Sequence, residues 1–95
     1  MPAYIIFIRD KTRDAAEIAA YKKLAGPSFE GYPVHRLALG GRHEVLEGPA
    51  AEAALLLEFP TFEDAKAWYQ SPAYKEASKL RHQGGDYRVI VFEGV

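Results

Sequence analysis

The segment 55–74 constrains the fold more than any other part of this chain. It begins with an apolar run that is typical of a buried strand. Thr61 follows, with Asp64 three residues later, in the spacing of a helix N-cap whose hydroxyl accepts a backbone hydrogen bond. Ser71 and Pro72 then begin a second helix, because proline fits the first helical position without losing an intrahelical hydrogen bond. A strand and two helix starts with almost no spacer predict a compact α+β unit.

Strand and helix signals alternate along the rest of the chain. Asp14, with Glu17 three residues later, has the spacing of a capping box and predicts a helix that ends or kinks at Gly26-Pro27. Gly40-Gly41 predicts a tight hairpin turn. Dense apolar or alternating runs predict strands at Ala3–Arg9, Val34–Leu39, His43–Glu47, Ala53–Phe59 and Tyr87–Glu93.

The resulting order of elements is β-α-β-β-α-β, with the segment 43–47 as a short hairpin arm before the third long strand. This is the split βαβ or ferredoxin-like pattern, an α+β sandwich in which helices cover one face of an antiparallel sheet. The 95 residues make a single domain of this kind, with no room for a second core.

Side-chain alternation divides the predicted sheet into two faces that are both largely apolar. The face expected under the helices holds Tyr4, Ile6, Ile8, His35, Leu37, Leu39, Leu55, Leu57, Phe59, Tyr87, Val89 and Val91. The second face holds Ile5, Phe7, Arg9, Val34, Arg36, Ala38, Leu56, Glu58, Arg88, Ile90 and Phe92. A bare face of this kind exceeds an ordinary exposed patch. We therefore expect a homodimer through the open sheet face, forming a dimeric α+β barrel.

The second face also carries charge. A carboxylate among large apolar side chains needs a partner, so Glu58 is expected to pair with Arg36 or Arg88. Such a cluster can fix how two sheets dock, or it can form the polar floor of a pocket in which Arg36 binds a ligand.

Charge and composition exclude several classes of function. With 12 basic and 13 acidic residues the net charge is -1, which offers no electrostatic footprint for nucleic acid or an anionic membrane. The absence of cysteine excludes disulfides, thiolate metal sites and cysteine nucleophiles. No apolar run approaches the roughly 18 residues that span a bilayer. The first residues lack the features of a signal peptide, so a cytoplasmic protein is expected.

An aromatic group around the break between the last two helical segments marks the predicted ligand site. Trp68, Tyr69 and Tyr74 flank this break, with Ser71 between them and Arg81 on the same helical stripe as Tyr74. Phenol and guanidinium groups suit a small acidic or aromatic ligand. The alternative is that the aromatic side chains are solid core and that Arg81 lies on the surface.

No common catalytic motif is present. The side chains available for acid–base chemistry are Glu58, His35 and Tyr74. The histidines, which include His43 and His82, lack metal-ligand spacing, so neither a metal nor a cofactor is expected. Two functions stay open: a cofactor-independent enzyme acting on a small organic acid or aromatic metabolite, and a non-catalytic module that binds a small molecule or stabilises a partner.

Four stretches carry a family resemblance: Glu44–Gly48, Leu57–Pro60, Ala67–Tyr74 and Val91–Val95. Through them the chain resembles the domain-of-unknown-function family 1330 over essentially its whole length. The resemblance implies a dimeric α+β barrel but no established activity, since the wider superfamily includes cofactor-free monooxygenases, lactone isomerases, haem enzymes and ligand-binding modules. The family's Arg-Gly-Gly turn is Leu39-Gly40-Gly41 here, so a ligand that uses that arginine would bind differently.

Overall fold

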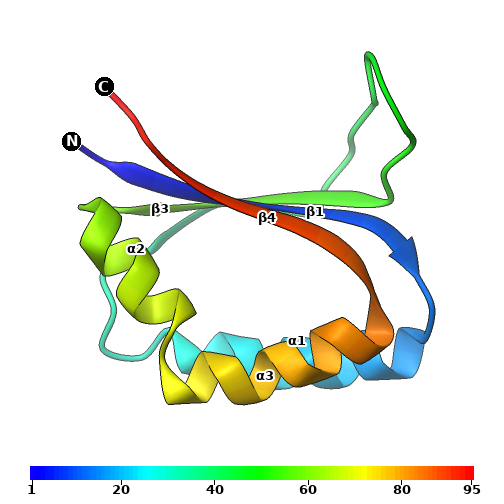
Figure 1. The fold of residues 1–95 in the computed structure, drawn as a ribbon, viewed down its shortest axis with the longest axis horizontal. Helices are drawn as coiled ribbons and strands as arrows, with labels where there is room; N and C mark the ends of the chain where they lie inside the picture. The colour runs from blue at the N-terminus through cyan, green and yellow to red at the C-terminus, as the bar shows by residue number, and fades with distance from the viewer.

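One layer of the protein is a four-stranded antiparallel sheet, and three helices cover one of its faces (Figure 1). The elements are β1 (Ala3–Thr12), α1 (Ala15–Ser28), β2 (His35–Leu39), β3 (Ala53–Phe59), α2 (Phe62–Tyr69), α3 (Pro72–Gly84) and β4 (Gly85–Glu93). The computed structural model describes residues 1–95. The strands lie in the order β2-β3-β1-β4, with every neighbouring pair antiparallel. This is the predicted ferredoxin-like α+β fold.

The three predicted N-caps are confirmed, and they set where the helices begin. The Asp14 carboxylate accepts hydrogen bonds from two backbone N–H groups in the first turn of α1. Thr61 Oγ1 accepts from the Asp64 N–H at 3.0 Å, and Ser71 Oγ accepts from the Tyr74 N–H at 3.2 Å. Because the Ser71 cap is extended, α2 and α3 cannot form one straight helix.

The end of α1 is tied to the aromatic core. The helix continues past Gly26-Pro27 to Ser28, because the N–H that proline lacks affects only the last turn. Ser28 Oγ donates to a carbonyl of α1 and accepts a hydrogen bond from the Trp68 indole N–H at 3.1 Å. Trp68 is 1% exposed and stacks on Phe29, with 4.6 Å between the ring centroids. This contact holds α2 against α1.

The predicted strand at residues 43–47 is wrong. Residues 40–52 form a loop without strand pairing, and β2 pairs directly with β3. Val45 and Leu46, the large apolar side chains of this segment, do not pack against the sheet. Both stay exposed. The loop rises from the sheet on the side away from the helices (Figure 1).

The face predicted for β1 is wrong by one residue. Ile5 and Phe7 are 1% and 4% exposed and lie under the helices, opposite Leu57 and Leu55 of β3. Five consecutive apolar side chains at positions 4–8 make alternation uninformative, so only pairing with the neighbouring strands sets the phase of β1. The faces predicted for β3 and β4 are confirmed. The corrected open face carries Tyr4, Ile6, Ile8, Leu56, Ile90 and Phe92.

The ion pairs predicted for the open face are also corrected. Glu58 Oε1 lies 3.2 Å from His35 Nδ1, not beside an arginine. Arg88 instead donates to both carboxylate oxygens of Asp10 at 2.8 and 3.0 Å, and these bonds hold the pKa of Asp10 below its usual value. Arg36 lies on the helix side, because β2 pairs with β3 in the phase that places His35 outward.

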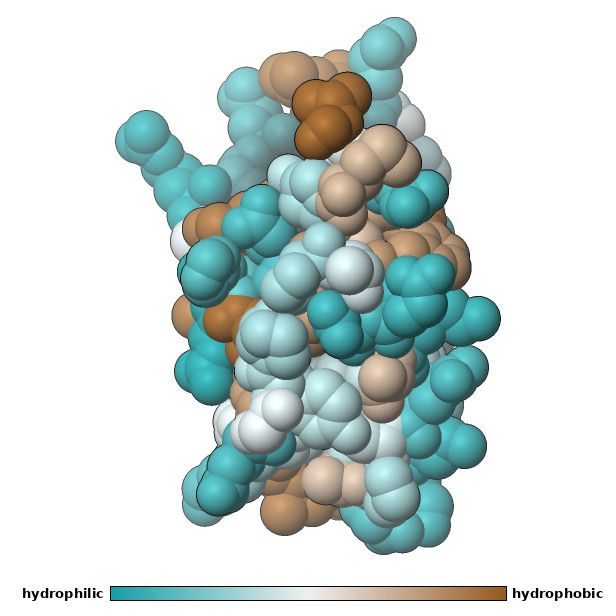
Figure 2. Space-filling view, turned by 90° about the vertical axis from the view of Figure 1, so that its left-hand side faces the viewer, coloured by the Kyte–Doolittle hydropathy of each residue, from teal (hydrophilic) through white to brown (hydrophobic).

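The end of the molecule at which both termini lie shows separate small hydrophobic patches among hydrophilic side chains (Figure 2). On the open sheet face, by contrast, Ile90 and Phe92 are 52% and 42% exposed. The end of the molecule shown in Figure 2 has no comparable row of large apolar side chains. No helix of the chain is both long and apolar enough to cross a membrane.

Candidate functional site

Two cavities lie between the helices and the sheet, on different sides of the aromatic core. The first, the interlayer cavity, has a volume of about 330 Å³ and lies between α1 and the sheet, on the side of β2. Ten of its 14 lining residues are hydrophobic, including Phe7, Leu57 and Trp68. A volume of this size falls in the range that holds small metabolites.

The charged side chains of the interlayer cavity are all basic. Arg9, Lys22 and Arg36 line it, and no acidic side chain does. Arg9 Nε lies 3.4 Å from a Glu52 carboxylate oxygen but makes no hydrogen bond. The Arg36 guanidinium sits 4.7 Å from the centroid of the Phe29 ring, a cation–π contact that leaves its N–H groups available. The cavity is therefore apolar with a positive wall.

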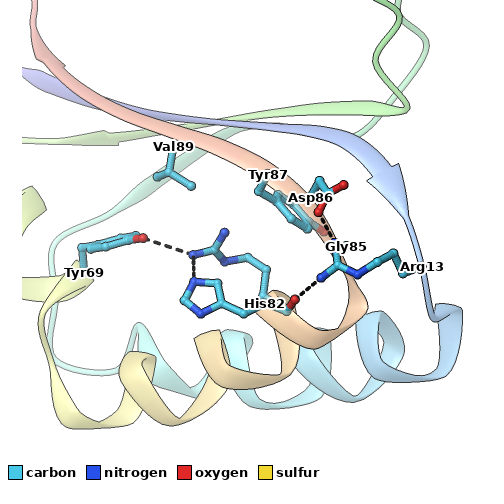
Figure 3. Close-up of a pocket in the computed structure, with 8 residues that line it drawn as sticks. Arg13, Tyr69, His82, Gly85, Asp86, Tyr87 and Val89 are labelled. Atoms are coloured by element: carbon cyan, nitrogen blue, oxygen red, sulfur yellow. Dashed lines mark hydrogen bonds and ion pairs between the residues drawn. The ribbon is translucent and has the colours of Figure 1, made fainter.

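The second cavity, the α3–β4 cavity, has a volume of about 450 Å³ (Figure 3). Arg81, Tyr69 and His82 line it, together with Arg13 and Asp86, which form an ion pair. Arg81 is 3% exposed, and its Nη2 donates to the Tyr69 hydroxyl at 3.1 Å and lies 3.2 Å from His82 Nε2. Burial, and then the Arg81 charge, lower the pKa of His82, so the imidazole that accepts this bond is neutral at pH 7.

The three residues predicted to act as acid or base do not meet in either cavity. Glu58 and His35 form their pair on the open sheet face and line a separate pocket of about 480 Å³ there. Tyr74 is fully buried, and its hydroxyl lies 2.8 Å from the Tyr21 hydroxyl. Burial, and then the neighbouring Tyr21, raise the pKa of Tyr74 above its ordinary value, so this phenol cannot act as a base at neutral pH.

The predicted ligand-binding residues are divided between the two cavities. Trp68 and Arg36 line the interlayer cavity, whereas Tyr69 and Arg81 line the α3–β4 cavity. Ser71 is a buried N-cap and lines neither. The aromatic rings fill the bend between α2 and α3 by packing on one another, with 4.2 Å between the centroids of Trp68 and Tyr74.

Arg9, Lys22 and His82 were not identified as site residues from the sequence. The predicted phase of β1 puts Arg9 on the wrong face, and no motif in the sequence marks Lys22. No group of three or more His, Asp or Glu side chains is placed to hold a metal ion.

A two-layer α+β sandwich with cavities between its layers places this protein in the ferredoxin-like class. Its sequence matches, over residues 2–95, the family described as "Domain of unknown function (DUF1330)", and the chain belongs to that family. No match was found among the curated proteins.

Several solved structures share the fold. A protein of unknown function from Rhodopseudomonas palustris is 23% identical, with 99% of this chain and 82% of that chain covered and a TM-score of 0.75. A dimeric ferredoxin-like protein of unknown function from Thermobifida fusca is 11% identical, with 97% and 90% covered and a TM-score of 0.66. SnoaB from Streptomyces nogalater, a cofactor-independent oxygenase, is 9% identical, with 99% and 92% covered and a TM-score of 0.59. At these identities the likeness shows the fold alone.

Proposed function

We propose that this protein binds a small organic anion with an aromatic or other apolar body in the interlayer cavity. The observation that carries the proposal is the combination of mainly apolar walls with Arg9, Lys22 and Arg36 and with no acidic lining residue. Apolar walls favour the body of such a ligand, and a guanidinium fork suits a carboxylate.

The geometry favours binding over catalysis at this site. The only titratable groups in the cavity besides the three cations are the phenols of Tyr21 and Tyr87. Burial raises the pKa of Tyr21 to about 12, so it keeps its proton at neutral pH. A general base with a pKa near the working pH is what proton abstraction requires, and none lines this cavity.

The second candidate function is a cofactor-independent enzyme that acts on a small organic acid or aromatic metabolite. Its support is the neutral His82 imidazole beside the buried Arg81, because the imidazole can accept a proton next to an anion that Arg81 binds. The fold that the chain shares with SnoaB adds only an analogy at the level of fold.

Binding of 2-naphthoate, followed by calorimetry, tests the first proposal. Lys22→Met and Arg36→Met should each weaken binding by roughly tenfold, about 1.4 kcal/mol, because each removes one charge from the cavity. Lys23→Met is the matched control, since Lys23 is the neighbouring exposed lysine of α1 and lines neither of the two cavities. The neutral 2-naphthamide should bind much more weakly than the acid. Equal affinity for the acid and the amide would contradict the proposal.

We also infer that two copies associate through the corrected open face. The support is the row of exposed large apolar side chains on that face, which a monomer would leave in water. The proteins of this fold from Thermobifida fusca and Bacteroides fragilis are described as dimeric.

A further inference from the structure

Arg81 is a buried cation without a counter-ion. Its side chain belongs to a residue that is only 3% exposed, and a guanidinium carries five N–H donors. Nη2 directs its hydrogen bonds at two neutral groups, the Tyr69 hydroxyl and His82 Nε2. Nε is buried and has no partner. None of the ion pairs of the protein includes Arg81.

The surrounding rings offset only part of the cost of burying this charge. The guanidinium carbon lies 5.7 Å from the Phe7 ring centroid and 5.1 Å from that of Tyr87. Cation–π contacts stabilise a buried cation by less than the loss of its hydration destabilises it. An anion beside Arg81 would remove this imbalance.

The α3–β4 cavity gives an anion access to Arg81. The one carboxylate that lines the cavity, Asp86, is already held by Arg13. With two arginines and one aspartate, the lining has a formal charge of 2 − 1 = +1 while His82 is neutral. Tyr69, His82 and Tyr87 surround the space between α3 and β4 (Figure 3).

We propose that the α3–β4 cavity is an oxyanion site, in which Arg81 binds the carboxylate or phosphate group of a small molecule. Tyr69 and His82 are positioning residues, because their bonds to Nη2 fix the guanidinium and leave Nε without a partner. This site is separate from the interlayer cavity, since the two linings share only Tyr87 and use different cations.

Chemical-shift mapping on the unaltered, isotopically labelled protein tests the site. Sodium phosphate and sodium acetate are titrated at pH 7 against sodium chloride at matched ionic strength. At least one oxyanion should shift the amide signals of Arg81, His82 and residues 85–87 in a saturable way that chloride does not reproduce. Saturation by phosphate alone assigns a phosphate ligand, and saturation by acetate alone assigns a carboxylate. Shifts that chloride reproduces, or that fall around Lys22 and Arg36, would overturn the proposal.

Variants separate this site from the one under the proposed function. Arg81→Met should abolish the saturable shifts, whereas Arg88→Met, which removes an arginine paired with Asp10 on the other sheet face, should leave them unchanged. Lys22→Met should also leave them unchanged. Arg81→Met removes an unpaired buried charge, so its stability without added anion should equal or exceed that of the unaltered protein. Survival of the shifts in Arg81→Met would refute the assignment, and the mapping on the unaltered protein decides the matter if this variant fails to fold.

Discussion

Burial changes the chemistry of the two tyrosines whose hydroxyls meet between α1 and α3. The Tyr21 and Tyr74 oxygens lie 2.8 Å apart, and burial raises the pKa of Tyr21 to about 12. An unfolded tyrosine loses its proton near pH 10. From pH 10 to about 12 the native state therefore binds more protons than the unfolded state, and the free energy of unfolding falls as the pH rises.

Tyr21→Phe should change both the level and the slope of this pH dependence. At pH 8 the variant should unfold with about 1 kcal/mol less free energy, because the Tyr74 hydroxyl loses its partner. Between pH 10 and 11 its stability should fall less steeply than that of the unaltered protein. Urea unfolding followed by Trp68 fluorescence measures both effects, with Tyr32→Phe as the control. An unchanged slope would show that Tyr21 ionises normally in the folded protein.

The sequence identified four side chains that line the two cavities, Arg36, Trp68, Tyr69 and Arg81, but not Arg9, Lys22 or His82. Thr61 and Ser71 were predicted as caps because capping depends on residues three positions apart. Arg9 and Arg36 depend on which face each strand buries, and pairing across the sheet decides this. Arg81 was identified as an anion-binding candidate, yet its burial without a counter-ion emerges only once α3 packs beneath β4.

At the scale of elements, the close approach of α3 to α1 depends on Gly84. A Cβ at this position would lie 2.6 Å from Ile18 Cδ1 and 3.0 Å from the Ile18 backbone nitrogen. The Gly84 carbonyl also accepts hydrogen bonds from the Arg13 and Asp14 N–H groups, at 2.7 and 3.0 Å, just before α1 begins. The two helices therefore meet where no side chain fits.

Gly84→Ala should lower the free energy of unfolding by about 1–3 kcal/mol, because the backbone of α1 must move to admit a methyl group. The intrinsic gain in helix propensity, about 1 kcal/mol, works in the opposite direction. Gly41→Ala is the matched control, since a Cβ there meets nothing within 4 Å. Chemical denaturation compares the two variants. Equal stability of Gly84→Ala and the unaltered protein would mean that α1 yields without cost.

The observed strands and helices were predicted well, whereas the strand predicted at residues 43–47 does not form. Apolar runs and N-caps located all four strands and the helix starts. Gly40-Gly41 predicts a hairpin turn followed by a strand at 43–47, and Gly40 does adopt a positive φ of 84°. A glycine turn alone does not make a second strand: the outer edge of β2 stays unpaired, and residues 43–47 do not pair with it.

At the scale of the whole molecule, the two faces of the sheet differ in what covers them. The helices bury one face, while the open face leaves Ile90 and Phe92 in contact with solvent. The loop that carries Val45 and Leu46 rises beside this open face (Figure 1). In the proposed dimer, a second copy placed face to face would bury the apolar row. The Arg88–Asp10 and His35–Glu58 pairs then give the contact a polar frame.

Ile90→Lys should convert the proposed dimer to a monomer, because it places a charge within the apolar row that the second copy would bury, where an unpaired cation is costly. Sedimentation at tens of micromolar should give the unaltered protein a mass of 2 × 10.6 = 21.2 kDa and the variant one of 10.6 kDa. Leu24→Lys is the matched control, since Leu24 is similarly exposed, at 46% against 52% for Ile90, but lies on α1 in the helix layer. It should stay dimeric. If Leu24→Lys dissociates and Ile90→Lys does not, the copies meet through their helices, and the open face is left to another partner.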